Sequence, residues 1–209
     1  MSSPVARRVD EIFHALTPER LTLRARESDV LRTQIAVTRI PAPTGEEGAR
    51  ALWVAEQLRA SGLAPSRDAA GNVLARIAGR SGGDPVVVCA HLDTVFTTAD
   101  VDVVADGARV SAPGISDNGR GLATMLAVAS AMQRGSRSLV RAVEFVATTG
   151  EEGAGNLRGV RHLFDEVPSA CDNTLWIAER ANVEIEFGRP LLPNFAIPEG
   201  FTDDSDYLR

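Results

Sequence analysis

The stretch VVVCAHLDTV, residues 86–95, is the most informative part of this 209-residue sequence. Its first residues form a short apolar, β-branched run, which predicts a buried strand. The run leads to His91 and Asp93, whose side chains point to the same face of an extended chain. An imidazole beside a carboxylate at a strand end suits a metal ligand with its orienting neighbour, or an acid–base pair. For a lone histidine, simple packing is the commoner role, so the interpretation depends on the acidic residues downstream.

Predicted strands and helices alternate between residues 70 and 180, which predicts an α/β fold with a mostly parallel central sheet flanked by helices. The predicted strands cover residues 72–78, the run from Val86, 140–147 and 174–178, with two short strands in the loop 97–116. The predicted helices cover residues 29–40, Thr44 to Gly62, Gly119 to Gly135, and 156–166. Thr44 and Glu47 match a capping box, with Thr44 as the N-cap of its helix.

The sequence divides into three predicted parts. Residues 1–26 are polar and rich in arginine, and we expect a mobile N-terminal arm there. Residues 27–180 carry the alternating pattern and form the predicted main domain. Residues 181–209, rich in proline and aspartate, predict an irregular acidic tail.

Acidic residues recur where predicted strands end, after the stretch that holds His91. They are Glu151 with Glu152, and Glu179, while Asp117 lies in a glycine-rich connection before a helix. In a parallel sheet, ligands gather outside the carboxyl ends of the strands. Converging carboxylates cannot all be buried unpaired, and a divalent cation such as zinc, which accepts imidazole nitrogen and carboxylate oxygen, would relieve their repulsion. On spacing alone, a solvated acidic rim is the alternative.

Composition excludes several classes of function. The net charge of −6 gives no basic surface for nucleic acid and no attraction to anionic lipid, and no apolar run has the length of a membrane span. The N-terminus lacks the apolar core of a secretory signal. With only Cys89 and Cys171, we expect a protein of the reducing cytoplasm, with Cys89 as a small buried apolar residue.

Three motifs, HLDTV at 91–95, GISDNGRG at 114–121 and TGEEG at 149–153, resemble the signatures of one enzyme family in their usual order. The segments PAPT at 41–44 and DAAGN at 68–72 extend this resemblance, which runs from about residue 29 to residue 180. The family is that of the zinc metallopeptidases that include peptidase T, carboxypeptidase G, acetylornithine deacetylase and aminoacylase. The resemblance implies a metal-dependent hydrolase of peptide or N-acyl amino acid amide bonds, with a partial catalytic domain over residues 27–180.

The resemblance also implies a role for each motif residue. His91 would ligate one metal ion, and Asp93 would orient His91. Asp117 would bridge two zinc ions, for which cobalt or manganese are alternatives. Glu151 would be the general base, and Glu152 would ligate the other ion.

The sequence departs from the family after these motifs. The next family ligand is usually an aspartate before glycine, and Glu179 before Arg180 takes that place here. Such enzymes continue into an inserted dimerisation domain and then supply a second ligand histidine. We expect that domain to be absent and the second metal site to be incomplete, because His14 and His162 are the only other histidines. A truncated or frame-shifted product is therefore one expectation.

Other functions remain alternatives at this point. The chain could be a catalytically inactive remnant that acts as a metal-binding or interaction module. The glycine-rich run 153–159 loosely resembles a dinucleotide fingerprint, but Glu151 and Glu152 would repel a pyrophosphate. A serine hydrolase is weaker still, because the run 114–118 lacks the final glycine of a nucleophile elbow.

Overall fold

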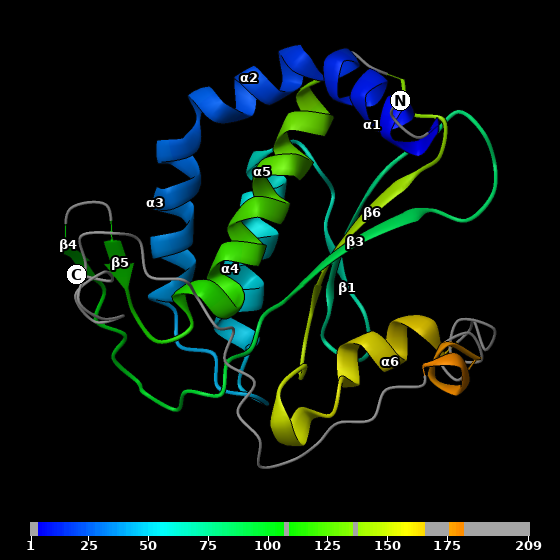
Figure 1. Cartoon of the computed structure of the whole chain (residues 1–209). Coiled ribbons are helices and arrows are strands. Elements are labelled where there is room, and N and C mark those ends of the chain that lie inside the picture. The colour runs from blue at the N-terminus through cyan, green and yellow to red at the C-terminus, as the bar shows by residue number, and fades with distance from the viewer. Residues whose placement is uncertain (1–3, 107–108, 136–137, 166–175, 182–209) are drawn as a thin grey trace, which may run out of the picture. The chain divides into compact units, whose positions relative to one another are not determined.

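The computed structural model describes residues 4–106, 109–135, 138–165 and 176–181 (Figure 1). The chain separates into two compact units, residues 1–167 and 168–209. The boundaries expected at residues 26 and 180 stay predictions. In the described residues, no helix is both long enough and apolar enough to pass through a membrane.

The first unit begins with helices and continues with alternating elements. Its first helices are α1 (Pro4–Ala15), α2 (Thr17–Ala25), α3 (Glu27–Thr38) and α4 (Gly48–Ala60). There follow β1 (Ser66–Arg67), β2 (Val73–Ile77), β3 (Val86–His91), β4 (Val104–Asp106) and β5 (Arg109–Ser111). The irregular helical segment η1 (Ile115–Arg120) leads into α5 (Gly121–Arg134), β6 (Val143–Thr148), the short turn η2 (Gly153–Gly155) and α6 (Arg158–Phe164). The strands and helices expected from the sequence in this unit are therefore present.

The central sheet confirms the predicted α/β class, but it is mixed rather than mostly parallel. Its strand order is β1-β2-β6-β3, in which β3 and β6 are parallel and the other two pairs are antiparallel. The connection from β2 to β3 consists only of residues 78–85. A parallel crossover needs about a dozen residues or more, so β3 must run in the direction opposite to that of β2, with β6 between them. The longer connection from β3 to β6 contains α5 and allows the parallel pair.

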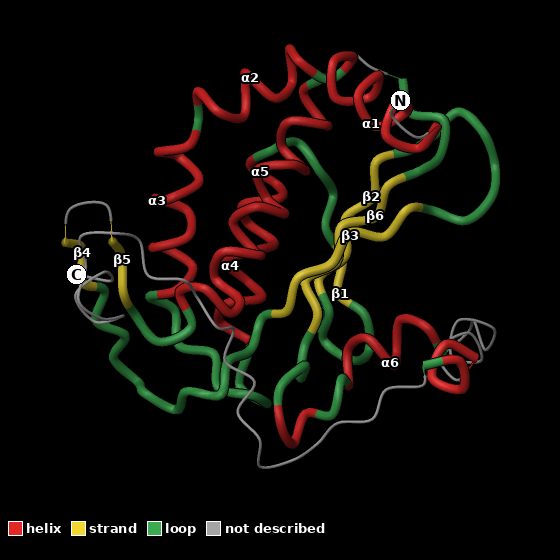
Figure 2. Tube along the Cα trace, in the orientation of Figure 1, coloured by secondary structure: helices red, strands yellow, loops and turns green. Residues whose placement is uncertain are grey.

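Helices α4 and α5 contact the sheet, and α3 packs beside α5 (Figures 1 and 2). Fully buried Leu58 of α4 and Leu122 of α5 meet Val73 and Phe145 of the strands in one apolar core. The burial of these side chains is the main force that holds the helical layer on the sheet.

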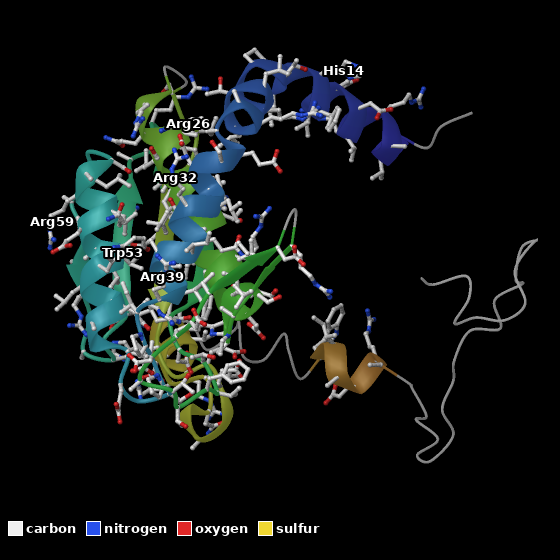
Figure 3. All side chains as sticks on the ribbon, turned by 90° about the vertical axis from the view of Figure 1, so that its left-hand side faces the viewer. His14, Arg26, Arg32, Arg39, Trp53 and Arg59 are labelled. Atoms are coloured by element: carbon white, nitrogen blue, oxygen red, sulfur yellow. The ribbon has the colours of Figure 1, made fainter. Side chains whose placement is uncertain are left out.

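The outward side of α3 is polar (Figure 3). Arg26, just before α3, and Arg32 both form ion pairs with Asp29. Pairs three residues apart on a helix surface support the helix by only a few tenths of a kcal/mol. The packing of α3 therefore depends on its inward side, where Val37 is fully buried.

Two local predictions are wrong. Thr44 is not an N-cap, because residues 43 and 94 form an isolated β-bridge and α4 begins only at Gly48. Strand β3 is not buried throughout: Val86 is 49% exposed and Cys89 is exposed, since β3 lies at an edge of the described sheet. The predicted end of the helix at Gly62 is confirmed by its φ of +88°, which glycine adopts freely.

In the second unit, residues 176–181 are described. The strand expected over 174–178 is wrong where it can be compared, because Trp176 to Arg180 are helical and exposed; residues 174 and 175 lie outside the described part. The guanidinium of Arg180 lies 4.0 Å from the ring centre of Trp176. A cation–π contact between residues four apart favours a helical turn.

Candidate metal centre

The candidate site lies where the parallel strands β3 and β6 end. His91 is the last residue of β3 and is in register with Thr148, the last residue of β6. The sheet therefore brings His91 beside the loop that follows β6, residues 149–152, here named the Glu-pair loop. This is the strand-end position in which α/β sheets usually bind ligands.

Three predicted ligands meet at this point. One donor atom each from His91, Asp117 and Glu152 lies within 4.8 Å of the others. The His91 Nε2–H donates to Asp117 Oδ1 at 2.8 Å, and Glu151 Oε2 lies 3.9 Å from the same nitrogen. The His91 side chain is 11% exposed, whereas that of Asp117 is 75% exposed. The site thus has a buried floor and an open rim.

Asp93 lies fully buried behind the histidine and joins it to the Glu-pair loop. His91 Nδ1–H donates to the Asp93 carbonyl oxygen at 3.1 Å, and Nδ1 lies 3.6 Å from the Asp93 carboxylate. The amides of Glu151 and Glu152 donate to the two carboxylate oxygens, each at 3.0 Å. The hydroxyl of Thr44 donates to one of them at 3.0 Å. The predicted role of Asp93 was to orient His91. Asp93 also holds the backbone of the Glu-pair loop.

Charge interactions shift the pKa values of this pair in opposite directions. Burial disfavours the charged form of His91, but hydrogen bonds with Asp93 and Asp117 and the nearby Glu151 charge prevail and raise its pKa to about 9. Burial also opposes ionisation of Asp93, but hydrogen bonds from His91 and from the two loop amides hold its pKa well below the usual range. Without a metal ion, the imidazole is therefore protonated at neutral pH and Asp93 is ionised.

Two further buried side chains fix the start of the Glu-pair loop. The Thr149 amide donates to Asn72 Oδ1, and the Gly150 amide donates to Glu47 Oε1, each at 3.0 Å. Together with the two amides on Asp93, every backbone N–H from residue 149 to residue 152 therefore donates to a buried side chain. Asn72 had no predicted role, because nothing in its local sequence marks an asparagine after a turn as buried.

The segment that carries Asp117 is held differently. Gln34 Nε2 of α3 donates to the Ile115 carbonyl at 2.7 Å, and Arg120 donates to Gln34 Oε1 at 3.1 Å. Gly114 precedes the segment with a φ of +72°, which favours glycine. Asp117 is thus placed by the Ile115 backbone before it and by the Arg120 side chain after it, while its own side chain stays exposed.

The donor set fits a divalent cation. An imidazole and two carboxylates are ligands that zinc accepts. Burial raises the pKa of Glu152, as do the charges of Glu151 and Asp117, which shows that these acidic groups repel one another. A bound cation would remove that repulsion.

Glu179, the remaining predicted ligand, lies in the exposed helical turn of the second unit. The metal-compatible group found among the described residues does not include it. Its role as a ligand stays a prediction. His162 is exposed, and its Nε2 lies 3.8 Å from the Asp68 carboxylate.

Comparison with known proteins gives the family and the fold. The profile of peptidase family M28 matches residues 72–184. A tripeptidase from Staphylococcus aureus shares 22% identity and a TM-score of 0.51, over 61% of this chain and 40% of the tripeptidase. Human carnosine dipeptidase 1 shares 14% identity and a TM-score of 0.59, over 72% of this chain and 37% of the dipeptidase. At these identities, the likeness concerns the fold.

A separate match concerns a short segment. The DNA polymerase III subunit alpha of Pseudomonas aeruginosa is 47% identical over 47 residues, which are 22% of this chain and 4% of the polymerase subunit. Because the match covers so small a share of the polymerase subunit, it says nothing about the activity of this chain.

The predicted resemblance to zinc metallopeptidases is confirmed by the family match and by the peptidase folds. The chain spans less than half of the length of either peptidase structure. The match at 72–184 nevertheless covers more than half of the sequence and contains every candidate ligand, and on that basis the chain belongs to peptidase family M28.

Proposed function

We propose that this chain forms the metal-binding catalytic part of a hydrolase that cuts the amide bond of small peptides or N-acyl amino acids. The observation that carries the proposal is the meeting of His91, Asp117 and Glu152 at the ends of two parallel strands, with Glu151 beside them. The family match supports hydrolysis of the peptidase type. The two cysteines support the cytoplasm as its compartment.

His91 Nε2, Asp117 and Glu152 are the groups that would hold zinc, with cobalt or manganese as alternatives. When bound, such an ion acts as a Lewis acid toward the carbonyl of the scissile bond. Asp117 also remains our candidate to bridge a second ion, with Glu179 as a further ligand. Asp93 stays ionised behind His91 and keeps the imidazole and the Glu-pair loop in one arrangement.

Glu151 is the proposed general base. Its carboxylate lies 3.9 Å from His91 Nε2 and is only partly buried, so it faces the open side of the site. Its neighbour Glu152 belongs to the metal group. Glu151 takes a proton from the attacking water and returns it to the leaving nitrogen, which needs no other acid.

Zinc titration and a peptidase assay on the same sample test this function. We expect binding at micromolar or better affinity, which His91→Ala abolishes, and we expect Glu151→Gln to keep zinc while it loses hydrolysis. Equal zinc content in wild type and His91→Ala after dialysis would contradict the proposed site. An active Glu151→Gln protein would contradict the proposed base.

The second candidate is a metal-binding module without catalysis. It is favoured by the metal group of the described residues, which offers only His91, Asp117 and Glu152 and so leaves a second ion short of ligands. Zinc binding that depends on His91, without hydrolysis of tripeptides or N-acyl amino acids, would favour this candidate.

A further inference from the structure

Glu47 is a buried carboxylate outside the group of predicted ligands and is only 4% exposed. Its Oε1 accepts hydrogen bonds from the Gly45 amide at 2.9 Å and the Gly150 amide at 3.0 Å. Arg158 Nη2 donates to the same oxygen at 3.3 Å. A buried charge is tolerated only when it is paired and hydrogen-bonded, and Glu47 has both kinds of partner.

The side chain of Glu47 makes no capping hydrogen bond to the helix that it precedes. Glu47 is the N-cap residue of α4, yet no side-chain hydrogen bond caps that helix. The carboxylate instead reaches Gly150, which is 103 residues away in the sequence. Its position is therefore explained by the Glu-pair loop rather than by α4.

Gly150 is held from both sides. Glu47 accepts its amide hydrogen, and the Arg158 amide donates to its carbonyl at 3.0 Å. Its φ is +60°, and a Cβ at this position would lie 3.2 Å from the Arg158 side chain. The backbone just before Glu151 is thus fixed in a conformation that favours glycine.

We propose that Glu47, supported by Arg158, is a positioning residue for the metal site, an inference that rests on the proposed function. Neighbouring Glu151 and Glu152 have separate tasks, and a rotation of the peptide before them would move both carboxylates. Asp93 accepts hydrogen bonds from the amides of Glu151 and Glu152, and Glu47 accepts one from the preceding residue, Gly150. Groups that orient metal ligands commonly change metal affinity about 10- to 100-fold when they are removed.

Zinc affinity, measured by competition with a chromophoric chelator, tests the proposal in three variants. Glu47→Gln keeps the shape of the side chain but places an amide against Arg158, and we expect zinc affinity to fall about 10-fold or more. Arg158→Met removes the ion pair from a partly exposed position, and we expect a fall of about threefold. Val54→Ala, in the buried core of α4, is the matched control: it lowers the melting temperature without touching the loop, so zinc affinity should not change.

Each result decides the proposal. Wild-type affinity in Glu47→Gln, or an equal loss in Val54→Ala, would overturn it. Should Glu47→Gln not fold, Arg158→Met decides in its place, and unchanged affinity there would overturn it.

Hydrogen exchange of the metal-free chain separates this proposal from the proposed function. If wild type binds no zinc, the proposed function fails, but the role of Glu47 can still be measured on residues 149–152. Faster exchange of those amides in Glu47→Gln than in Val54→Ala supports the positioning role, and equal protection overturns it.

Discussion

The two sides of the candidate site are held in opposite ways. The Glu-pair loop forms one side, here named the buried wall, and the segment that carries Asp117 forms the other, here named the open wall. The backbone amides of the Glu-pair loop donate hydrogen bonds to three buried side chains, those of Asp93, Glu47 and Asn72. Asp117, on the other wall, has a side chain that is 75% exposed and reaches His91 from a segment held by its backbone. On the proposed function, metal binding would need both walls, and we expect folding without metal to depend mainly on the buried wall.

This difference predicts which substitutions lower both zinc affinity and the free energy of unfolding, and which lower zinc affinity alone. Removing a buried acceptor leaves amides without partners, and each costs about 1 to 3 kcal/mol. Removing an exposed carboxylate leaves only groups that water can reach.

Asp93→Ala should have the largest effect. It orphans the amides of Glu151 and Glu152 and removes the partner of His91, so we expect the free energy of unfolding to fall by about 3 kcal/mol and zinc binding to be lost. Asp117→Ala is the matched variant on the open wall. It should also lose zinc, but its free energy of unfolding should change by less than about 1 kcal/mol. Urea denaturation of both metal-free proteins measures the difference, and equal destabilisation would refute the distinction between the walls.

The pH dependence of zinc binding should be the next largest effect. His91 must lose its proton to ligate a metal, and its pKa in the metal-free protein is raised to about 9. Apparent affinity should therefore rise about 10-fold per pH unit, or about 100-fold from pH 6 to pH 8. Calorimetric titration at several pH values measures this, with His162→Ala as a control that keeps the same slope. A flat profile would show that His91 is already neutral in the free protein.

The same shift has the opposite sign for stability. A histidine whose folded pKa lies above its unfolded value of about 6.5 stabilises the fold fully below that value. This contribution is lost as the pH rises through about 9. The metal-free chain should thus lose stability over the pH range in which its zinc affinity rises, and thermal unfolding with and without zinc shows both trends.

Asn72→Ala should have an intermediate effect. Asn72 is fully buried, accepts from the Thr149 amide and donates to the Gly159 carbonyl at 2.9 Å, so it joins the end of β6 to α6. We expect a loss of about 2 kcal/mol in the free energy of unfolding, with a smaller fall in zinc affinity than in Glu47→Gln. Ser61→Ala, which removes a partly exposed hydrogen bond at the end of α4, is a suitable control. A zinc defect equal to that of Glu47→Gln would show that the loop acts as one rigid unit.

The open wall and the motifs that carry the candidate ligands could be predicted from sequence because their signals are local. His91 follows an apolar run and Asp117 lies in a glycine-rich connection before a helix, and the structure brings both into the metal group with Glu152. The alternation of elements also predicted the α/β class. The antiparallel pairing of β2 was missed, although the short connection 78–85 signals it once its length is compared with that of a crossover.

The buried wall could not be predicted in the same way. Thr44 and Glu47 match a capping box, but both side chains bind distant partners instead. Thr44 donates to Asp93, 49 residues away, and Glu47 accepts from Gly150, 103 residues away. Asn72 carries no local sign that it is buried. For residues 176–180 the error ran the other way, because a local signal predicted burial that the structure does not show. An apolar run forms a buried strand only if neighbouring elements cover it. In this unit the run is an exposed helical turn with a Trp–Arg contact.

Arg120→Ala should have the smallest effect. Arg120 donates to Gln34 at 3.1 Å, but the bond from Gln34 to the Ile115 carbonyl, at 2.7 Å, does not need the guanidinium. Because Arg120 is exposed, water can replace its guanidinium at Gln34 Oε1, and the segment should keep its place. We expect the free energy of unfolding to stay within about 0.5 kcal/mol of wild type and zinc affinity to fall by no more than about threefold. Gln34→Ala, which removes the bond to Ile115 itself, should lower zinc affinity further than Arg120→Ala. The reverse order in a chelator competition would mean that Arg120, and not the backbone contact, holds Asp117 in the site.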